Sequence, residues 1–96
     1  MTKRWGEGIV WIVVHDHPQA GISVWPFASK KNSIKFIREI IEEWMQDHAR
    51  DKEDKKLIAE LFDEGSVQEA LTVWNDMTMD VGAPEGIIWN QYEVQP

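Results

Sequence analysis

Two histidines flank an aspartate in residues 13–25, VVHDHPQAGISVW, and these side chains have the clearest potential for chemistry in the chain. If the segment is one continuous strand, His15 and His17 point to the same face, where two imidazoles can bind one zinc or other transition-metal ion. Such a site needs at least one further ligand, which His48 or a carboxylate would have to supply. A metal-dependent activity at His15 and His17 is therefore one hypothesis for this segment.

A turn explains the same residues differently. Pro18 and Gly21 favour the backbone dihedrals of a turn, and the Asp16 side chain can accept a hydrogen bond from the backbone two residues later. The sequence has neither a His-x-x-x-His pair nor a cysteine. We therefore interpret the segment as the tip of a β-hairpin, predict no metal ligand and no cofactor, and keep a contact between this loop and a partner as a further alternative. For His48, at the end of an apolar helical stripe, we expect a structural role.

Other catalytic patterns are missing from the sequence. Without cysteine there is no thiol nucleophile, and neither a Gly-x-Ser-x-Gly motif nor a glycine-rich phosphate loop is present. Adjacent carboxylates occur at 42–43, 53–54 and 63–64, but neighbouring residues on a helix do not share a face, so they are not preset acid–base pairs. We predict no catalytic residue and a protein that is not an enzyme.

Negative charge is concentrated in the middle of the chain. The net charge is −7, and residues 39–80 hold thirteen acidic side chains against four basic ones. An acidic surface disfavours direct nucleic-acid binding and suits a partner protein with a basic surface. Arginine side chains of such a partner donate hydrogen bonds to carboxylates as they do to phosphates. The alternative is a solvated helical face that serves solubility. The predicted partner-binding residues are Glu39, Glu42, Glu43, Asp47, Asp51, Glu53, Asp54, Glu60, Asp63 and Glu64.

Six tryptophans are more than a core of this size easily encloses. The first predicted strand is apolar on both faces, whereas the predicted helices form one layer, which covers one face. We therefore expect an apolar patch on the open side of the sheet, formed by Trp11, Trp25 and Trp89, that serves a partner or a homodimer. The alternative is that Trp5, Phe27 and the termini fold over this side.

Hydrophobic periodicity predicts the elements that position these residues. The first helix is capped by Ser29 or Asn32 and carries an apolar stripe from Ile34 to His48. Ser66 and Glu69 have the spacing of a capping box at the start of the last helix. The predicted segments are strands at 9–15 and 21–27, a helix to about 48, a charged connector or frayed helix end at 49–56, a short helical face at 57–62, a helix from 66 to 77, a turn-rich segment at 79–86 and a strand at 87–94.

These elements predict one α+β domain over residues 1–96, with the order β-β-α-α(α)-β. We expect a three-stranded antiparallel sheet in the order 2-1-3, packed on two main helices. No apolar run approaches the length of a membrane helix, so we expect no membrane contact and a cytoplasmic location.

The whole-chain pattern resembles the small acidic, tryptophan-rich proteins that phages and other mobile elements encode, among them anti-CRISPR inhibitors of bacterial defence. The segments that carry the resemblance are WIVVHDHPQAGISVWPFAS, EEWMQDHA, GSVQEALTVWND and IIWNQYEV. The resemblance implies a non-enzymatic protein that binds and blocks its target, and it carries over no site residue.

Together these features predict a protein-binding module, namely a phage-type inhibitor that blocks a nucleic-acid-directed defence complex through its acidic helices, in the host cytoplasm. The alternative is a homodimeric accessory protein without an inhibitory role. Metal-dependent activity at the hairpin histidines is the third hypothesis.

Overall fold

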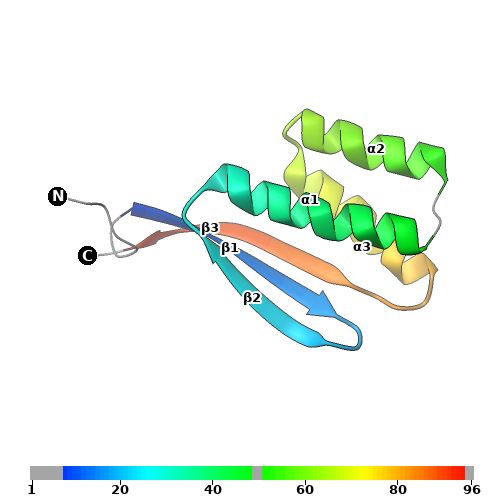
Figure 1. The fold of residues 1–96 in the computed structure, drawn as a ribbon, viewed down its shortest axis with the longest axis horizontal. Coiled ribbons are helices and arrows are strands. Elements are labelled where there is room, and N and C mark those ends of the chain that lie inside the picture. Colours follow the sequence, from blue (N-terminus) through cyan, green and yellow to red (C-terminus); the bar gives the residue numbers. More distant parts are fainter. Residues whose placement is uncertain (1–7, 49–50, 95–96) are drawn as a thin grey trace.

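The computed structural model describes residues 8–48 and 51–94, which form three strands and three helices (Figure 1). In chain order the elements are β1 (Gly8–His17), β2 (Gly21–Phe27), α1 (Lys30–Asp47), α2 (Lys52–Asp63), α3 (Val67–Asp80) and β3 (Gly86–Val94). The predicted α+β class and element order are confirmed. The alternative that involved Trp5 lies outside the described residues.

The sheet is antiparallel and has the order β2-β1-β3, as predicted. All three helices lie on one side of it (Figure 1). The central strand supplies Val13, which is fully buried under the helices. In the register, Val13 pairs with Trp25 on one side and Trp89 on the other. Because paired residues share a face of the sheet, odd-numbered residues of all three strands face the helices and even-numbered residues face away.

Helix α1 follows the predicted pattern. The Ser29 hydroxyl caps it by accepting a hydrogen bond from the Asn32 amide at 3.2 Å. Ile37, Ile41 and Trp44 recur at helical spacing and are buried against the sheet and the other helices. The helix ends at Asp47, with His48 as its C-cap.

Helix α2 begins earlier than predicted. The segment 49–56 was expected to be a connector or a frayed end, but α2 starts at Lys52. The Asp51 side chain accepts a hydrogen bond from the Asp54 amide at 2.9 Å, which is the N-cap signal inside this charged run. The helix ends where Gly65 adopts a φ of 82°, and the Gly65 and Ser66 amides donate to the carbonyls of Phe62 and Leu61.

The predicted capping box of α3 is wrong. Ser66 occupies the N-cap position, but its side chain makes no capping hydrogen bond. Its ψ of 60° differs from the extended N-cap backbone of Ser29 and Asp51, because Ser66 also closes the end of α2. Only residues 64–66 separate the two helices, so Ser66 takes part in the end of α2 and in the start of α3, and it makes no side-chain cap.

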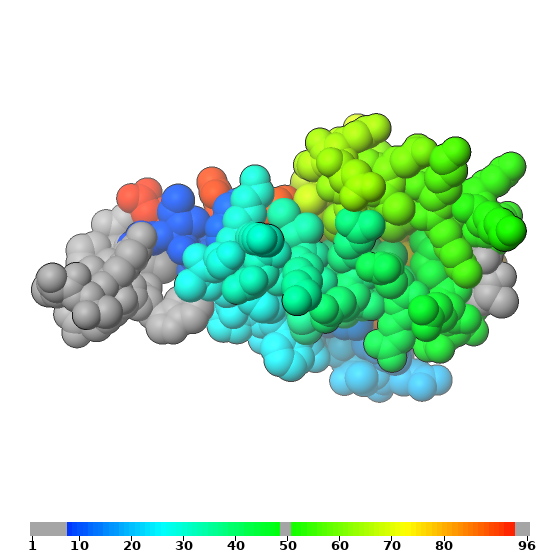
Figure 2. All heavy atoms as spheres, turned by 45° about the horizontal axis from the view of Figure 1, so that its top comes forward, coloured from blue at the N-terminus to red at the C-terminus, as the bar shows by residue number. Residues whose placement is uncertain are grey.

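The core lies between the sheet and the helices. Trp74 from α3 is fully buried and packs edge-to-face on Trp44 from α1, with ring centroids 6.1 Å apart. A buried hydrogen bond joins the sheet to α1, where the Trp89 Nε1 donates to the Ser33 Oγ at 2.9 Å. Figure 2 shows α1 and α2 side by side over the same face, with the β1–β2 turn in light blue projecting below them.

Candidate functional site

A cleft of about 400 Å³ lies where the β1–β2 turn, the last turns of α1 and the segment before β3 meet. It collects all three histidines of the chain, although they are far apart in the sequence. Three carboxylates also reach it, two from α1 and one from the residue before β3. The described lining residues are His15, His17, Pro18, Gln19, Ile40, Glu43, Trp44, Asp47, His48, Ala83 and Glu85.

Glu85 is a buried residue of this cleft, which we call the histidine cleft, and its side chain is only 6% exposed. The His15 Nε2 lies 3.0 Å from the Glu85 Oε1, and the His17 Nε2 lies 3.6 Å from the same oxygen. At 3.0 Å the His15 Nε2 can donate a hydrogen bond to the carboxylate, which accepts when it is ionised, whereas 3.6 Å is too long for a hydrogen bond from His17. A buried carboxylate needs such donors to offset its loss of hydration. Sequence reasoning missed Glu85 altogether.

Helix α3 fixes the position of Glu85 through its backbone. The Glu85 amide donates to the Thr78 Oγ1 at 2.9 Å, and the Glu85 carbonyl accepts from the Asn75 Nδ2 at 2.7 Å. Thr78 is fully buried, so water does not compete for this contact. The antiparallel register then brings this end of β3 beside the end of β1, where Asp16 pairs with Gly86.

His17 organises the turn that Asp16 was expected to organise. The His17 Nδ1 accepts hydrogen bonds from the Gln19 amide at 3.1 Å and the Ala20 amide at 3.0 Å. Asp16 points to the opposite face of the strand and is exposed. The hairpin itself is confirmed, and Gly21 closes it with a φ of 85°. Both ring nitrogens of His17 thus have neighbours inside the protein.

His48 lines the outer wall of the cleft. Its ring stacks on Trp44 with centroids 4.3 Å apart and an interplanar angle of 22°. Its Nδ1 lies 3.0 Å from the Trp44 carbonyl oxygen, which can only accept, so Nδ1 carries the proton. This arrangement gives His48 the structural contact that its place on the α1 stripe predicted, and it leaves Nε2 as the acceptor of the neutral ring.

The described lining of the cleft contains neither a metal-binding group of side chains nor a hydroxyl group. Within the ranges 8–48 and 51–94, no group of three or more histidine, aspartate or glutamate side chains is arranged to hold a metal ion. His15 and His17 converge on Glu85, with no second carboxylate beside them at ligand distance in these ranges. The described lining contains no serine, threonine or tyrosine hydroxyl that could act as a nucleophile.

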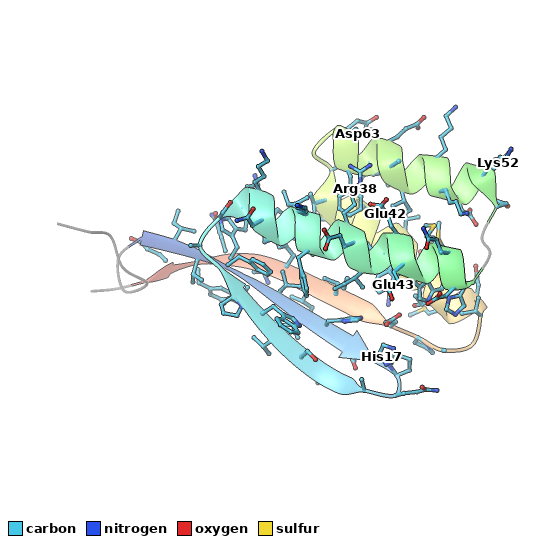
Figure 3. The ribbon with its side chains drawn as sticks, in the orientation of Figure 1. His17, Arg38, Glu42, Glu43, Lys52 and Asp63 are labelled. Carbon is cyan, nitrogen blue, oxygen red and sulfur yellow. The ribbon has the colours of Figure 1, made fainter. Side chains whose placement is uncertain are left out.

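The ten predicted acidic residues do not form one uniform surface. Arg38 pairs with Glu42 on the same helix, α1, at 3.4 Å, and with Asp63 of α2 at 3.2 Å (Figure 3). Glu60 pairs with Lys56 at 3.9 Å. Asp51 caps α2, and Asp54 is partly buried and is not free of interactions. Glu53 on α2 and Glu64 at its C-cap are exposed.

Glu39, Glu43 and Asp47 are arranged together on one helix. They are spaced four residues apart on α1 and therefore form one row on its surface, which we call the α1 acidic row. All three are exposed, and none of them forms an ion pair with any residue that the structure describes. Glu43 and Asp47 also line the histidine cleft. Figure 3 shows Glu43 on the side of α1 that faces His17, away from Arg38.

A second hollow of about 270 Å³ separates α1 from α2. Its lining mixes both signs of charge with apolar side chains, and the Arg38–Glu42 ion pair lies within it. The Arg38 and Glu42 charges there already compensate each other inside the protein. The α1 acidic row and the histidine cleft are therefore the better candidate site.

The three predicted patch tryptophans lie on the helix-facing side of the sheet, not on the open side where we expected them. Trp11 stacks on Trp89 at 4.9 Å, and the Lys30 Nζ lies 5.4 Å above the Trp11 ring. Trp89 is buried, whereas Trp25 is 46% exposed and contacts Phe36 beside the edge of the sheet. The error is one of parity, because the first strand is apolar on both faces and the sequence does not say which face the helices cover.

Comparison of the chain with models of protein families, with curated proteins and with solved structures gave no match. None of the described helices is long and apolar enough to cross a membrane.

Proposed function

We propose that this protein is a non-enzymatic binding module that receives a basic segment of a partner protein along the α1 acidic row and in the histidine cleft. One observation carries the proposal: Glu39, Glu43 and Asp47 are exposed in a row with no ion pair inside the described structure. Two of them border a preformed cleft.

Stability alone does not account for such a row. Like charges one helical turn apart destabilise a helix by about 0.2–0.5 kcal/mol per pair. On the other side of α1, Glu42 does have a partner inside the protein, because Arg38 pairs with it and with Asp63 of α2. A set of carboxylates that lack partners beside a cleft is typical of a surface whose positive partner comes from another molecule.

The chemistry of the cleft favours arginine as the inserted side chain. A guanidinium group can form paired hydrogen bonds with a carboxylate, and Glu43 and Asp47 offer two carboxylates one turn apart. The Trp44–His48 stack beside them adds an aromatic wall, against which planar guanidinium groups pack well.

The narrower form of the proposal is a phage-type inhibitor of a nucleic-acid-directed defence complex. Its support is the sequence resemblance to anti-CRISPR proteins, together with the capacity of carboxylates to occupy arginine sites that otherwise bind phosphates. In this form the row takes the place of a nucleic-acid backbone in the basic channel of the complex.

The test is affinity capture from bacterial lysate with matched charge variants. Glu43→Lys/Asp47→Lys reverses the row at the cleft, and Glu53→Lys/Glu64→Lys makes the same change of net charge on α2. We expect the first variant to lose the partner that the wild type captures, whereas the α2 variant retains it. Equal capture by both variants, with folding confirmed by circular dichroism, would contradict the proposed site.

A further inference from the structure

The side of the sheet that faces away from the helices is almost entirely apolar. Ile22 is 69% exposed, Val24 60%, Ile88 59% and Tyr92 52%. The open face, as we call it, consists of the even-numbered strand residues Val10, Ile12, Val14, Asp16, Ile22, Val24, Pro26, Ile88, Asn90 and Tyr92. A contiguous apolar face of this kind is at the upper end of what a monomer in water leaves uncovered, and such faces often serve an interaction.

We infer that the open face is the interface between two copies of this chain. Charge is the first reason for a second copy. The chain carries a net charge of −7, yet among the described residues the open face has one charged side chain, Asp16, at its end. Two like-charged copies repel least when they meet through the face that carries the least charge.

The area available is the second reason. The open face has three strands about 4.8 Å apart and the ten side chains named above, which together offer a contact area of roughly 600 Å² per copy. Two copies packed face to face would therefore bury about 1,200 Å², the lower end of the range for stable interfaces. Two such sheets pack about 10 Å apart at an angle of about 30°. Because β1 is central in each sheet, a two-fold axis near Ile12 places β1 over β1 and brings Ile22 and Ile88 to the flanks.

The inference is independent of the proposed function. The helices of both copies lie outside the paired sheets, so the α1 acidic row and the histidine cleft stay exposed on each copy. The dimer would thus present two binding sites on opposite sides.

The mass of the protein in solution tests the inference directly. We expect sedimentation equilibrium of the full chain to give twice the chain mass of 11.2 kDa at micromolar concentrations. Val24→Lys/Ile88→Lys should raise the dimer dissociation constant by about tenfold or more, because it places unpaired charge inside the interface. The matched control is Leu57→Lys/Met79→Lys, which changes two exposed apolar residues on α2 and α3 by the same charge and should leave the dimer intact.

Ile22→Thr/Val24→Thr supplies a milder second variant, because threonine keeps the β-branched shape of a strand residue. It should also weaken the dimer without loss of the folded circular-dichroism spectrum. A wild-type mass of 11.2 kDa at high protein concentration, or a dimer that survives both open-face changes, would overturn the inference.

Discussion

Glu85 owes its place in the cleft to one buried hydroxyl group. The Thr78 Oγ1 accepts from the Glu85 amide at 2.9 Å and also lies within donor distance of the Asn75 and Glu85 carbonyl oxygens, at 2.7 Å and 3.0 Å. One residue thus joins the last turn of α3 to the start of β3. The position of the Glu85 carboxylate, which lies at hydrogen-bond distance from His15, therefore depends on the hydrogen bonds of Thr78.

Replacement of this hydroxyl should therefore be costly. We expect Thr78→Val to lower the free energy of unfolding by about 1–3 kcal/mol, because the buried Glu85 amide loses its acceptor while the side-chain shape is kept. Thr72 is the matched control, since it lies on the same helix but is exposed and bonds only to the Gln68 carbonyl. Thr72→Val should change stability by less than about 0.5 kcal/mol in urea denaturation. Equal effects of the two substitutions would show that the Thr78 contact contributes nothing.

The three helices differ in how their N-termini are capped. Ser29 and Asp51 cap α1 and α2 with side-chain oxygens, whereas Ser66 at α3 does not. The sequence predicted a cap by Ser29 or Asn32 at the first helix and a capping box of Ser66 and Glu69 at the last. The difference arises from the preceding chain, because Ser66 follows directly on the glycine that ends α2.

Alanine substitutions at the two serines should separate these cases. We expect Ser29→Ala to destabilise the protein by about 0.5–2 kcal/mol, because the Asn32 amide loses its cap. Ser66→Ala should cost less than about 0.5 kcal/mol, since no capping bond is lost. Thermal unfolding followed by circular dichroism measures both. A larger loss for Ser66→Ala would mean that its side chain does cap α3.

At the scale of the whole molecule, the sheet order and the single helical layer were predictable from the sequence. A strand that is apolar on both sides belongs in the centre, and Ile37, Ile41 and Trp44 mark the covering helix. Which side of the strand the helices cover was not predictable, because a change of one residue in parity exchanges the two apolar sets. For this reason Trp11, Trp25 and Trp89 were expected on the open side of the sheet, although they lie on the side that faces the helices.

The candidate site was only partly predictable for a related reason. Local pattern identified the acidic residues of α1 and the paired histidines of the hairpin. The contact between His15 and Glu85 joins residues 70 positions apart, and it depends on the register of β3 and on Thr78. The sequence signal was a lone glutamate before Gly86 and the last strand, which becomes informative once the pairing of Asp16 with Gly86 is known.

If the protein acts by charge-led contact, its affinity for a purified partner should depend strongly on the salt concentration. We expect the dissociation constant, measured by calorimetry, to rise more than tenfold between about 0.05 and 0.5 M salt, because exposed charges are screened over shorter distances as salt increases. Glu43→Gln/Asp47→Gln should bind more weakly and with a smaller salt dependence. An affinity that does not change with salt, equal for the wild type and this variant, would contradict the account.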